Sequence, residues 1–460
     1  MKTLIDPDHA LADGLATLRT EYQVPTDFPS AVIAAATDAA QKPLTEHIDR
    51  RTIPFVTLDP ASSTDLDQAL AIEAAGNDLL LHYAIADVAW FVDDGGEIDQ
   101  EAWRRGETLY LPDGKASLYP KLLSEGAASL LANVDRPAVI FTVRVAPDGL
   151  ASLDGAERAV IRSTAKLAYE TVRPEDLPQG FGELARRISA AEDARGAARV
   201  DPPEQEVAPD ASGTLRLMFR PRLPAEDQNA ALSLATNLAV ATLLLDHRTG
   251  LFRVMAPPDA AATQRLRHSA AAFGLDWPKD KTLDQFSRTL DAGDPKQAAF
   301  MLAVRRAGSG ASYAPYRDGV TPWHAAMAAT YAQATAPLRR LADRYVVRAA
   351  LAVASGQPVP PAVLDAFEKL PAVMAKADAR AGQIERAVID LAEAALLNGR
   401  ENETFAARVI DADDRGGRVQ LCDLPVVARV DGIGMEPGAP VTLRLTGVDL
   451  GKRSVRFAQA

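Results

Sequence analysis

The sequence predicts an α+β protein in three consecutive parts, and one observation on each part supports this. Residues 1–50 are rich in alanine and repeat apolar side chains every three or four positions, as one face of a helix does. Residues 51–400 begin with runs of apolar and β-branched residues, typical of a sheet, and continue mainly as helices that would surround it. Residues 401–460 contain five short predicted strands divided by Gly and Asp turns, which suits a small β-barrel of the OB type.

The composition limits the classes of protein that this chain can belong to. A chain of 460 residues has room for about two to four domains, and 47% hydrophobic residues can fill large cores. Cys422 is the only cysteine, so no intrachain disulfide can form, and a cytoplasmic location is expected. The first residues lack the apolar core of a signal peptide, and no stretch of about 18 uncharged apolar residues occurs, so we expect no membrane span. The net charge of −12 argues against a broad surface that coats nucleic acid but leaves room for a narrow basic channel.

The N-terminal part predicts two helices, over residues 10–22 and 30–41, separated by a turn that contains Pro25 and Pro29. Two helices around a tight turn fit part of a helix-turn-helix module. They fit equally a helical brace on the next domain. The brace is favoured because the segment is short and not basic.

In the middle part, strands precede helices, and strands return in the last part. The strands of the sheet are predicted at residues 53–58, 79–86, 138–145 and 151–161, with a short helix at 98–105. The long helices are predicted at residues 226–247, 260–273, 296–306, 337–354 and 361–398, and a strand is predicted at 214–219 between Pro-rich loops. The strands of the barrel are predicted at residues 405–411, 417–421, 426–430, 441–445 and 454–457.

An acidic loop follows the first strand of the middle part. Asp59, Asp65 and Asp67 lie within nine residues there, and loops that leave a strand often display chemistry. Clustered carboxylates repel one another and are costly to desolvate together, and a hard cation such as Mg²⁺ relieves that cost. The alternative is an Asp-rich turn whose carboxylates cap backbone N–H groups.

Several motifs occur in an order that resembles the ribonuclease II (RNB) family of exoribonucleases, of which the chain would be a divergent bacterial member. Residues 55–69, Phe-Val-Thr-Leu-Asp-Pro-Ala-Ser-Ser-Thr-Asp-Leu-Asp-Gln-Ala, are similar to the acidic signature of that family. The segments with family counterparts that follow are residues 84–88, Tyr110-Leu-Pro, residues 131–137, residues 335–343 (Thr-Ala-Pro-Leu-Arg-Arg-Leu-Ala-Asp) and Glu385-Arg386. The resemblance extends from about residue 28 to the C-terminus.

The resemblance implies a fold and an activity. It implies an RNB catalytic domain over residues 51–400, a short helical segment before it at 1–50 and an RNA-binding OB-fold barrel after it at 401–460. Family members use Mg²⁺, with Mn²⁺ as the alternative ion, to hydrolyse single-stranded RNA from the 3′ end to nucleoside 5′-monophosphates in RNA degradation or processing. We expect the 3′ end of single-stranded RNA as the partner, no obligate protein partner and a monomer.

The resemblance also implies roles for individual residues. Asp59, Asp65 and Asp67 would hold the metal, with Gln68 as a further ligand, while Asp67 also belongs to the catalytic set. Arg339 would neutralise the scissile phosphate. Glu385 would help position a second metal ion or the attacking water.

Contacts with RNA are implied for another group of residues. Tyr110 would stack against the terminal nucleotide, because every base has a π face. His324 matches a family histidine near the arginine motif. The other residues expected to contact RNA are Arg136, Arg340 and Arg348.

Each of these roles has a structural alternative. Arg339 follows Pro337 at the start of a predicted helix and could form a structural ion pair. Glu385 lies in a charged helix that could be a solvated face, and Tyr110 could be a core residue.

The chain departs from the family pattern at several positions. Gln68 occupies a position where the family usually has an aspartate, which predicts weaker metal affinity or a changed metal preference. Ala336 and Leu341 stand where the family has a serine and a tyrosine, and a helical glutamate upstream of Asn237 has no counterpart. About 50 residues precede the acidic loop, too few for the pair of cold-shock barrels of many relatives, so a less enclosed entrance for RNA is expected.

Three functions compete at this point. The first is the metal-dependent exoribonuclease. The second is a catalytically weakened RNA-binding regulatory protein with the RNB fold, supported by Gln68. The third is a metal-dependent phosphoesterase that acts on another substrate, supported by the acidic net charge.

Overall fold

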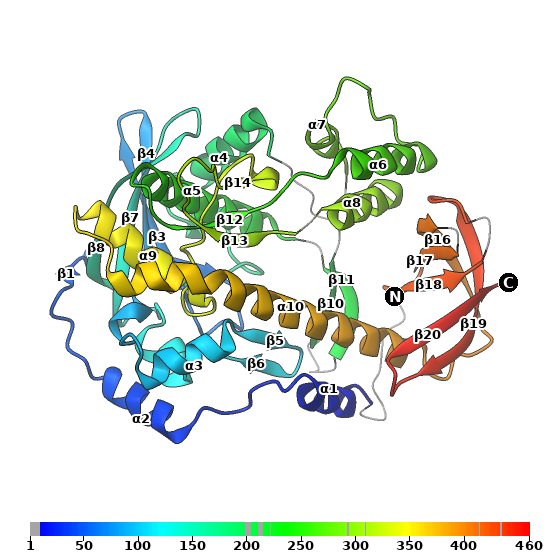
Figure 1. Ribbon diagram of the computed structural model, residues 1–460, viewed down its shortest axis with the longest axis horizontal. Helices are drawn as coiled ribbons and strands as arrows, with labels where there is room; N and C mark the ends of the chain where they lie inside the picture. Colours follow the sequence, from blue (N-terminus) through cyan, green and yellow to red (C-terminus); the bar gives the residue numbers. More distant parts are fainter. Residues whose placement is uncertain are drawn as a thin grey trace.

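A computed structural model describes residues 10–197, 204–209, 215–220, 222–291, 294–308, 310–413, 415–432 and 435–460. A mixed sheet with its helices forms the larger part of the protein, and a small β-barrel forms the C-terminal part (Figure 1). Helix α10 (Pro361–Leu397), 37 residues long, runs from the sheet and its helices to the barrel.

The large sheet has seven strands in the order β1-β8-β7-β4-β3-β2-β9. Its strands are β1 (Ile48–Asp49), β2 (Val56–Asp59), β3 (Gln68–Ala75), β4 (Asp78–Ala86), β7 (Asp135–Val145), β8 (Ala151–Arg162) and β9 (Ala165–Ala168). The pairs β1–β8 and β2–β9 are parallel and the others are antiparallel. A two-residue turn joins β3 to β4, and Gly76 supplies the positive φ of 64° that such a turn needs.

One face of this sheet is buried under helices. Tyr83 and Phe141 are paired on adjacent strands and are fully buried on that face. The helices that pack on the sheet are α4 (Phe181–Arg195), α5 (Pro224–Asp246) and α9 (Leu341–Ala354). By length and composition alone α5 could cross a membrane, but 61% of its most apolar window is buried inside the protein, as in a core helix.

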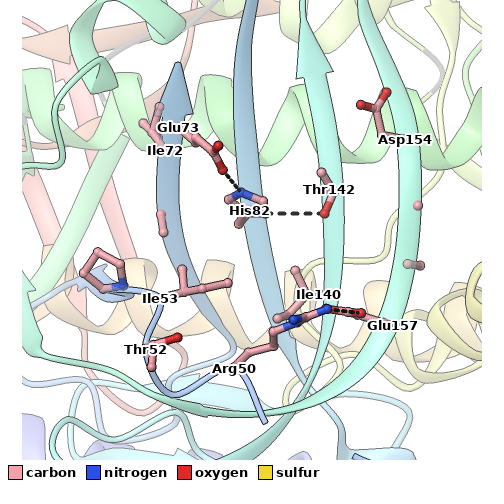
Figure 2. A pocket seen from close by; sticks show the side chains of 14 residues that line it. Arg50, Thr52, Ile53, Ile72, Glu73, His82, Ile140, Thr142, Asp154 and Glu157 are labelled. Atoms are coloured by element: carbon pink, nitrogen blue, oxygen red, sulfur yellow. Dashed lines mark hydrogen bonds and ion pairs between the residues drawn. The ribbon is translucent and has the colours of Figure 1, made fainter. Parts of the chain in front are cut away.

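The opposite face of the sheet carries a hollow of about 690 Å³, lined by residues of β3, β4, β7 and β8 (Figure 2). His82 and Thr142 belong to this face because side chains alternate along a strand. The His82 ring lies 3.2 Å from Glu73 Oε2 and 3.4 Å from the Thr142 hydroxyl.

The remaining elements surround the sheet or lead to the barrel. The helices are α1 (Ala10–Glu21), α2 (Ser30–Ala39), α3 (Glu97–Arg105), α6 (Ala260–Ala272), α7 (Leu283–Ser287) and α8 (Pro295–Ala307). The two-stranded pairs are β5 (Leu109–Leu111) with β6 (Gly114–Ala116), β10 (Glu204–Pro209) with β11 (Leu215–Arg220), β12 (Leu251–Val254) with β13 (Ser312–Pro315), and β14 (Trp323–His324) with β15 (Ala329–Thr330).

The predicted helix at residues 337–354 is wrong over its first four residues, because α9 begins only at Leu341. Arg340 has extended dihedral angles, φ −128° and ψ 123°, and forms an antiparallel bridge with Glu107. The backbone N–H of Thr108 donates to the carbonyl of Arg339 at 2.9 Å. Pairing with a distant segment therefore overrides the local helical pattern.

The N-terminal helices pack on the rest of the protein, as the brace interpretation predicts. Leu11, Leu15 and Leu18 of α1 form a buried cluster with Val388 and Leu391 of α10. Helix α2 contacts α3. Apolar burial of this kind contributes about 25 cal/mol for each Å² removed from water.

The barrel is a five-stranded antiparallel sheet in the order β18-β17-β16-β19-β20, with β18 and β20 close enough to nearly complete the circle. Its strands are β16 (Thr404–Asp413), β17 (Gly416–Leu421), β18 (Val427–Asp431), β19 (Pro440–Asp449) and β20 (Ser454–Gln459). Val419, Leu443 and Leu445 are fully or almost fully buried in its core. The five strands agree with the sequence prediction and with the OB-type architecture.

Candidate active site at the acidic loop

The acidic loop between β2 and β3 is held by side chains from other segments. The Ser129 hydroxyl accepts from Leu66 N at 2.9 Å and donates to Thr64 O at 2.8 Å. Lys166 Nζ donates to the carbonyls of Ala61 and Ser63, at 2.8 and 2.5 Å. Ser129 and Lys166 therefore fix the loop through its backbone N–H and carbonyl groups.

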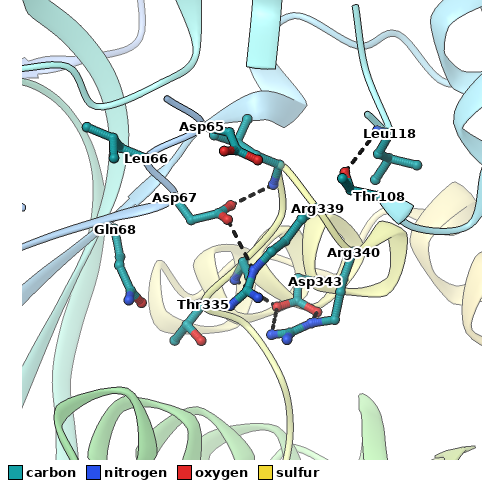
Figure 3. A network of polar contacts seen from close by, with 12 residues as sticks. Asp65, Leu66, Asp67, Gln68, Thr108, Leu118, Thr335, Arg339, Arg340 and Asp343 are labelled. Atoms are coloured by element: carbon teal, nitrogen blue, oxygen red, sulfur yellow. Dashed lines mark hydrogen bonds and ion pairs between the residues drawn. The ribbon is translucent and has the colours of Figure 1, made fainter. Parts of the chain in front are cut away.

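Asp67 is buried and joined to the segment before α9 (Figure 3). Leu338 N, 271 residues further along the chain, donates to Asp67 Oδ1 at 2.7 Å. Arg339 Nε lies 3.5 Å from Asp67 Oδ2. Burial raises the pKa of Asp67 to about 8, although Arg339 and the Leu338 N–H oppose that rise.

Asp59 ends β2 and belongs to the same electrostatic environment. Burial raises the pKa of Asp59 to about 6, Arg339 lowers it, and Asp65 raises it further. Asp65 and Arg339 influence the pKa of Asp67 in the same two directions. Asp59 Oδ2 is buried and has no hydrogen-bond partner among the described residues. Asp65 and Arg339 thus act electrostatically on both Asp59 and Asp67, and the roles of the three aspartates as metal ligands stay predictions.

Asp65 is held by the β5–β6 hairpin. Lys115 Nζ lies 2.7 Å from Asp65 Oδ1, and the Tyr110 hydroxyl donates to Asp65 Oδ2 at 3.3 Å. Tyr110 itself is 55% exposed, so its ring is not a core residue. Lys115 is not among the residues that the sequence motifs predict for the site. The turn at Pro112-Asp113 is the signal that could have found it, because the hairpin closed by this turn makes Lys115 the cross-strand partner of Tyr110.

Gln68 turns away from the Asp67 carboxylate (Figure 3). Its Oε1 accepts hydrogen bonds from the Tyr83 hydroxyl at 2.6 Å and from the Ser233 hydroxyl at 3.2 Å. The oxygen that was predicted to ligate a metal is thus already occupied. The structure gives Gln68 a role in joining β3 to α5 instead.

A cavity of about 1070 Å³ lies next to Arg339 and Gln68. Asn229, Ser233 and Asn237 of α5 contribute to its wall at intervals of four residues, which places them on one helix face. The Asn229 side-chain amide donates to Leu58 O at 3.2 Å, and Asn237 Oδ1 accepts from Ala334 N at 2.9 Å. This polar stripe in an otherwise apolar helix was not identified from the sequence.

Comparison with known proteins decides the family. The RNB domain matches residues 47–356, and the RNase II-type exonuclease C-terminal S1 domain matches residues 403–460. The chain belongs to the RNB family.

Two curated relatives of this RNB chain illustrate the similarity in sequence. Ribonuclease R of Aquifex aeolicus is 29% identical over 416 residues, which are 84% of this chain and 58% of the relative. Exoribonuclease 2 of Salmonella newport is 31% identical over 407 residues, which are 83% of this chain and 62% of the relative. The RNB chain thus spans about three fifths of the length of these relatives.

Solved structures show the same fold. RNase R of Mycoplasma genitalium, in complex with ribose-methylated single-stranded RNA, aligns with a TM-score of 0.86 at 18% identity, over 100% of this chain and 79% of that one. Yeast Ssd1, described as a pseudonuclease, aligns with a TM-score of 0.67 at 16% identity, over 93% of this chain and 56% of that one.

Two of the arginines predicted to bind RNA are engaged elsewhere in this RNB chain. Arg136 Nε donates to Ser129 O at 3.0 Å and so supports the residue that holds the acidic loop. Arg348 forms an ion pair with Asp94, with contacts of 2.5 and 2.8 Å. Neither arginine lines the cavity. Their contacts favour structural roles over the predicted ones.

Arg340 lines the cavity but is already paired. Its guanidinium makes two hydrogen bonds to Asp343, at 2.9 and 2.8 Å, and Asp343 also accepts from Ala336 N at 2.8 Å. This ion pair fixes the turn that carries Arg339. A contact between Arg340 and RNA stays a prediction.

His324 is buried at the start of a short 3₁₀ turn. Its Nδ1 accepts from Met327 N at 3.3 Å, and its ring meets Tyr331 edge to face. Burial lowers the pKa of His324, and the charge of Arg253 lowers it further. A buried ring that caps a turn does not support the predicted contact with RNA.

Glu385 is exposed on α10, while the adjacent Ile384 is buried against α1. Within the part of the chain that the structure describes, no hydrogen bond or ion pair joins Glu385 to the aspartates or to Arg339. The predicted role of Glu385, to help position a second metal ion or the attacking water, stays a prediction. The charged helix pattern, read as a solvated face, accounts for this residue better.

The carboxylates of two aspartates, Asp59 and Asp67, are suitable ligands for a divalent cation. Across the described residues, no group of three or more His, Cys, Asp or Glu side chains is arranged to hold a metal ion. Asp59 and Asp67 nevertheless have buried carboxylates with raised pKa values, and one Asp59 oxygen has no partner among the described residues. A cation beside either carboxylate would favour its charged form. Asp65 is neutralised by Lys115.

Proposed function

We propose that this RNB protein is a Mg²⁺-dependent exoribonuclease that hydrolyses single-stranded RNA from the 3′ end and releases nucleoside 5′-monophosphates, with Mn²⁺ as the alternative ion. The observation that carries the proposal is the approach of Arg339 to buried Asp67, at 3.5 Å, beside Asp59 and Asp65. Family membership makes RNA the substrate class to test first.

The chemistry divides between the ion and the protein. A divalent ion held by Asp59 and Asp67 would supply Lewis-acid stabilisation of charge on the phosphate oxygens. Arg339 is 47% exposed, so its guanidinium can turn from Asp67 to grip a phosphate. The backbone N–H of Leu338 holds the Asp67 carboxylate in place while this happens.

Binding of single-stranded RNA needs a stacking surface and a positive path. The exposed ring of Tyr110 lies beside the acidic loop and offers a surface worth roughly 1–3 kcal/mol for each stacked base. Exposed Arg418, Arg429 and Arg444 of the barrel supply positive charge in a chain whose net charge is −12. The similar RNase R of Mycoplasma genitalium was solved with single-stranded RNA. We further propose that the protein acts as a cytoplasmic monomer.

The proposal is tested with 5′-labelled single-stranded RNA in Mg²⁺ and then in EDTA. We expect a ladder that shortens from the 3′ end, disappears with EDTA, and slows by roughly 10²–10³-fold in Asp67→Asn. Internal cleavage, or an unchanged rate in EDTA, contradicts the proposal. Cleavage of a simple phosphodiester without cleavage of RNA supports the phosphoesterase instead.

A catalytically weakened RNA-binding protein is the second candidate. Two observations favour it: the Gln68 oxygen is occupied by hydroxyl groups, and Asp65 is paired with Lys115. The similar fold of Ssd1, a pseudonuclease, supports the same reading. Binding of the labelled RNA without any ladder in Mg²⁺ or Mn²⁺ identifies this case.

A further inference from the structure

Lys115 occupies a position in the candidate site that neither the motifs nor the proposed chemistry use. It belongs to β6 and pairs in register with Tyr110 of β5, so both side chains reach the same face of the hairpin. Both contact Asp65, Lys115 at one carboxylate oxygen and Tyr110 at the other. The hairpin thus holds Asp65 from two directions.

Lys115 also contacts a second acid. Its Nζ lies 2.7 Å from Asp65 Oδ1 and 3.2 Å from Glu125 Oε1. The three side chains are only 19%, 9% and 20% exposed, respectively. Two carboxylates therefore share one ammonium group in a place where water and salt screen charges weakly.

The remaining acids of the loop have no comparable partner. Asp59 Oδ2 is buried without a hydrogen-bond partner among the described residues. Asp67 accepts a hydrogen bond from Leu338 N at 2.7 Å, and Arg339 Nε lies 3.5 Å from its other carboxylate oxygen. Asp65 and Glu125 thus already contact a cationic side chain, whereas no ammonium group contacts Asp59 or Asp67 among the described residues.

We propose that Lys115 is a built-in cation that takes the place of a second divalent ion, so that the site binds one divalent ion, at Asp59 and Asp67. The inference rests on the metal requirement of the proposed function. An ammonium supplies positive charge and hydrogen-bond donors, but it cannot act as a Lewis acid. Lys115 is in this sense a positioning residue, which fixes Asp65 and satisfies its charge.

Removal of Lys115 should change the number of ions bound. The carboxylates of Asp65 and Glu125 both contact Lys115 Nζ, so without the ammonium group their negative charges repel each other. A divalent ion bound between them would relieve this repulsion. Arginine in place of lysine keeps the positive charge and should keep one ion. The matched control is Lys121→Met, because Lys121 is exposed on the segment that follows the same hairpin.

The experiment is a Mn²⁺ titration of the full chain without RNA, followed by electron paramagnetic resonance of free Mn²⁺ and by calorimetry. We expect one ion per chain in the wild type, in Lys115→Arg and in Lys121→Met, and two in Lys115→Met. Melting temperatures establish that each variant is folded.

Two ions in the wild type, or one ion in Lys115→Met, overturns the inference while the proposed exoribonuclease activity stands. No ion in the wild type overturns both the inference and the metal requirement of the proposed function. If Lys115→Met does not fold, Asp65→Asn in the otherwise wild-type chain tests the same point. We expect it to retain one ion with a Kd within about twofold, and loss of that ion overturns the inference.

Discussion

At the scale of single residues, the site combines buried carboxylates with cations that only partly compensate them. Burial raises the pKa of Asp67 to about 8 and that of Asp59 to about 6, because a charged carboxylate is disfavoured where water is excluded. Lys115 neutralises Asp65 directly, whereas Arg339 stays 3.5 Å from Asp67 and about half exposed. The ligand-free site is therefore strained by its own charge, and this strain is what a cation and a phosphate would relieve.

Asp67→Asn should stabilise the ligand-free protein while it slows RNA cleavage. Asparagine keeps an oxygen for the Leu338 N–H but carries no charge to bury. The folded-state pKa of Asp67 is raised to about 8, above its ordinary value of 3.8. The contribution of Asp67 to the free energy of unfolding is therefore complete below pH 3.8 and is lost as pH rises through about 8. We expect the variant to be more stable in EDTA by about 1–3 kcal/mol at high pH, and by less at low pH, in urea unfolding.

The control for this prediction is Asp93→Asn, because the Asp93 side chain is 89% exposed. It should change stability by less than about 0.5 kcal/mol at any pH. A loss of stability in Asp67→Asn at high pH would contradict the charge-strain interpretation.

Arg339→Lys should lower kcat with little effect on RNA affinity. Lysine keeps the charge but loses the planar fork that grips two phosphate oxygens. We expect a roughly 10²–10³-fold lower kcat from single-turnover cleavage of labelled RNA, with the Kd for RNA nearly unchanged. Arg348→Lys, in which the altered residue is paired with Asp94 and does not line the cavity, should cleave at the wild-type rate.

At the scale of elements, the acidic loop depends on one buried hydroxyl and one extended turn. Ser129 joins the loop through Leu66 N and Thr64 O, and Arg136 holds Ser129 in turn. The extended turn that carries Arg339 is fixed by its bridge to Glu107 and by the Arg340–Asp343 ion pair. Site geometry thus comes from contacts between segments that are far apart in the sequence.

Ser129→Ala should loosen the loop. It leaves Leu66 N and Thr64 O without their partner in a buried place, which costs about 1–3 kcal/mol. We expect a lower melting temperature together with slower RNA cleavage. Ser163→Ala is the matched control, because Ser163 is equally buried but its hydroxyl has no hydrogen-bond partner among the described residues. Equal losses in the two variants would show that the loop contacts do not matter.

At the scale of the whole molecule, Glu393 of α10 joins the sheet-containing part to the barrel. It accepts hydrogen bonds from Val427 N at 2.8 Å and from Gln205 Nε2 at 2.7 Å. Burial raises the pKa of Glu393 to about 7, nearby Asp390 raises it further, and the two hydrogen bonds and Arg418 lower it. The junction between the two parts therefore contains a buried acid that changes charge near neutral pH.

Glu393→Gln should remove one source of pH dependence in stability. The folded-state pKa of Glu393 lies above the ordinary value of 4.5, so its stabilising contribution is complete below pH 4.5 and is lost as pH rises through about 7. Glutamine keeps an acceptor and does not titrate. We expect the melting temperature of the variant, relative to wild type, to rise by about 2–4 °C between acidic and mildly alkaline buffers. Parallel curves would contradict this, and Glu401→Gln, at an exposed position, provides the control.

Local patterns in the chain were enough to predict most of the helices, the five strands of the barrel and the acidic loop after β2. The family resemblance added the approach of Arg339 to that loop. These features follow from periodicity and from motifs that can be recognised one at a time. Four features depended on the folded protein: the extended turn before α9, the hydroxyl partners of Gln68, the exposure of Glu385 and the contact of Lys115 with Asp65. Each of these is set by a partner from a distant segment or by the packing of a helix face, and local sequence carries no record of which segments meet.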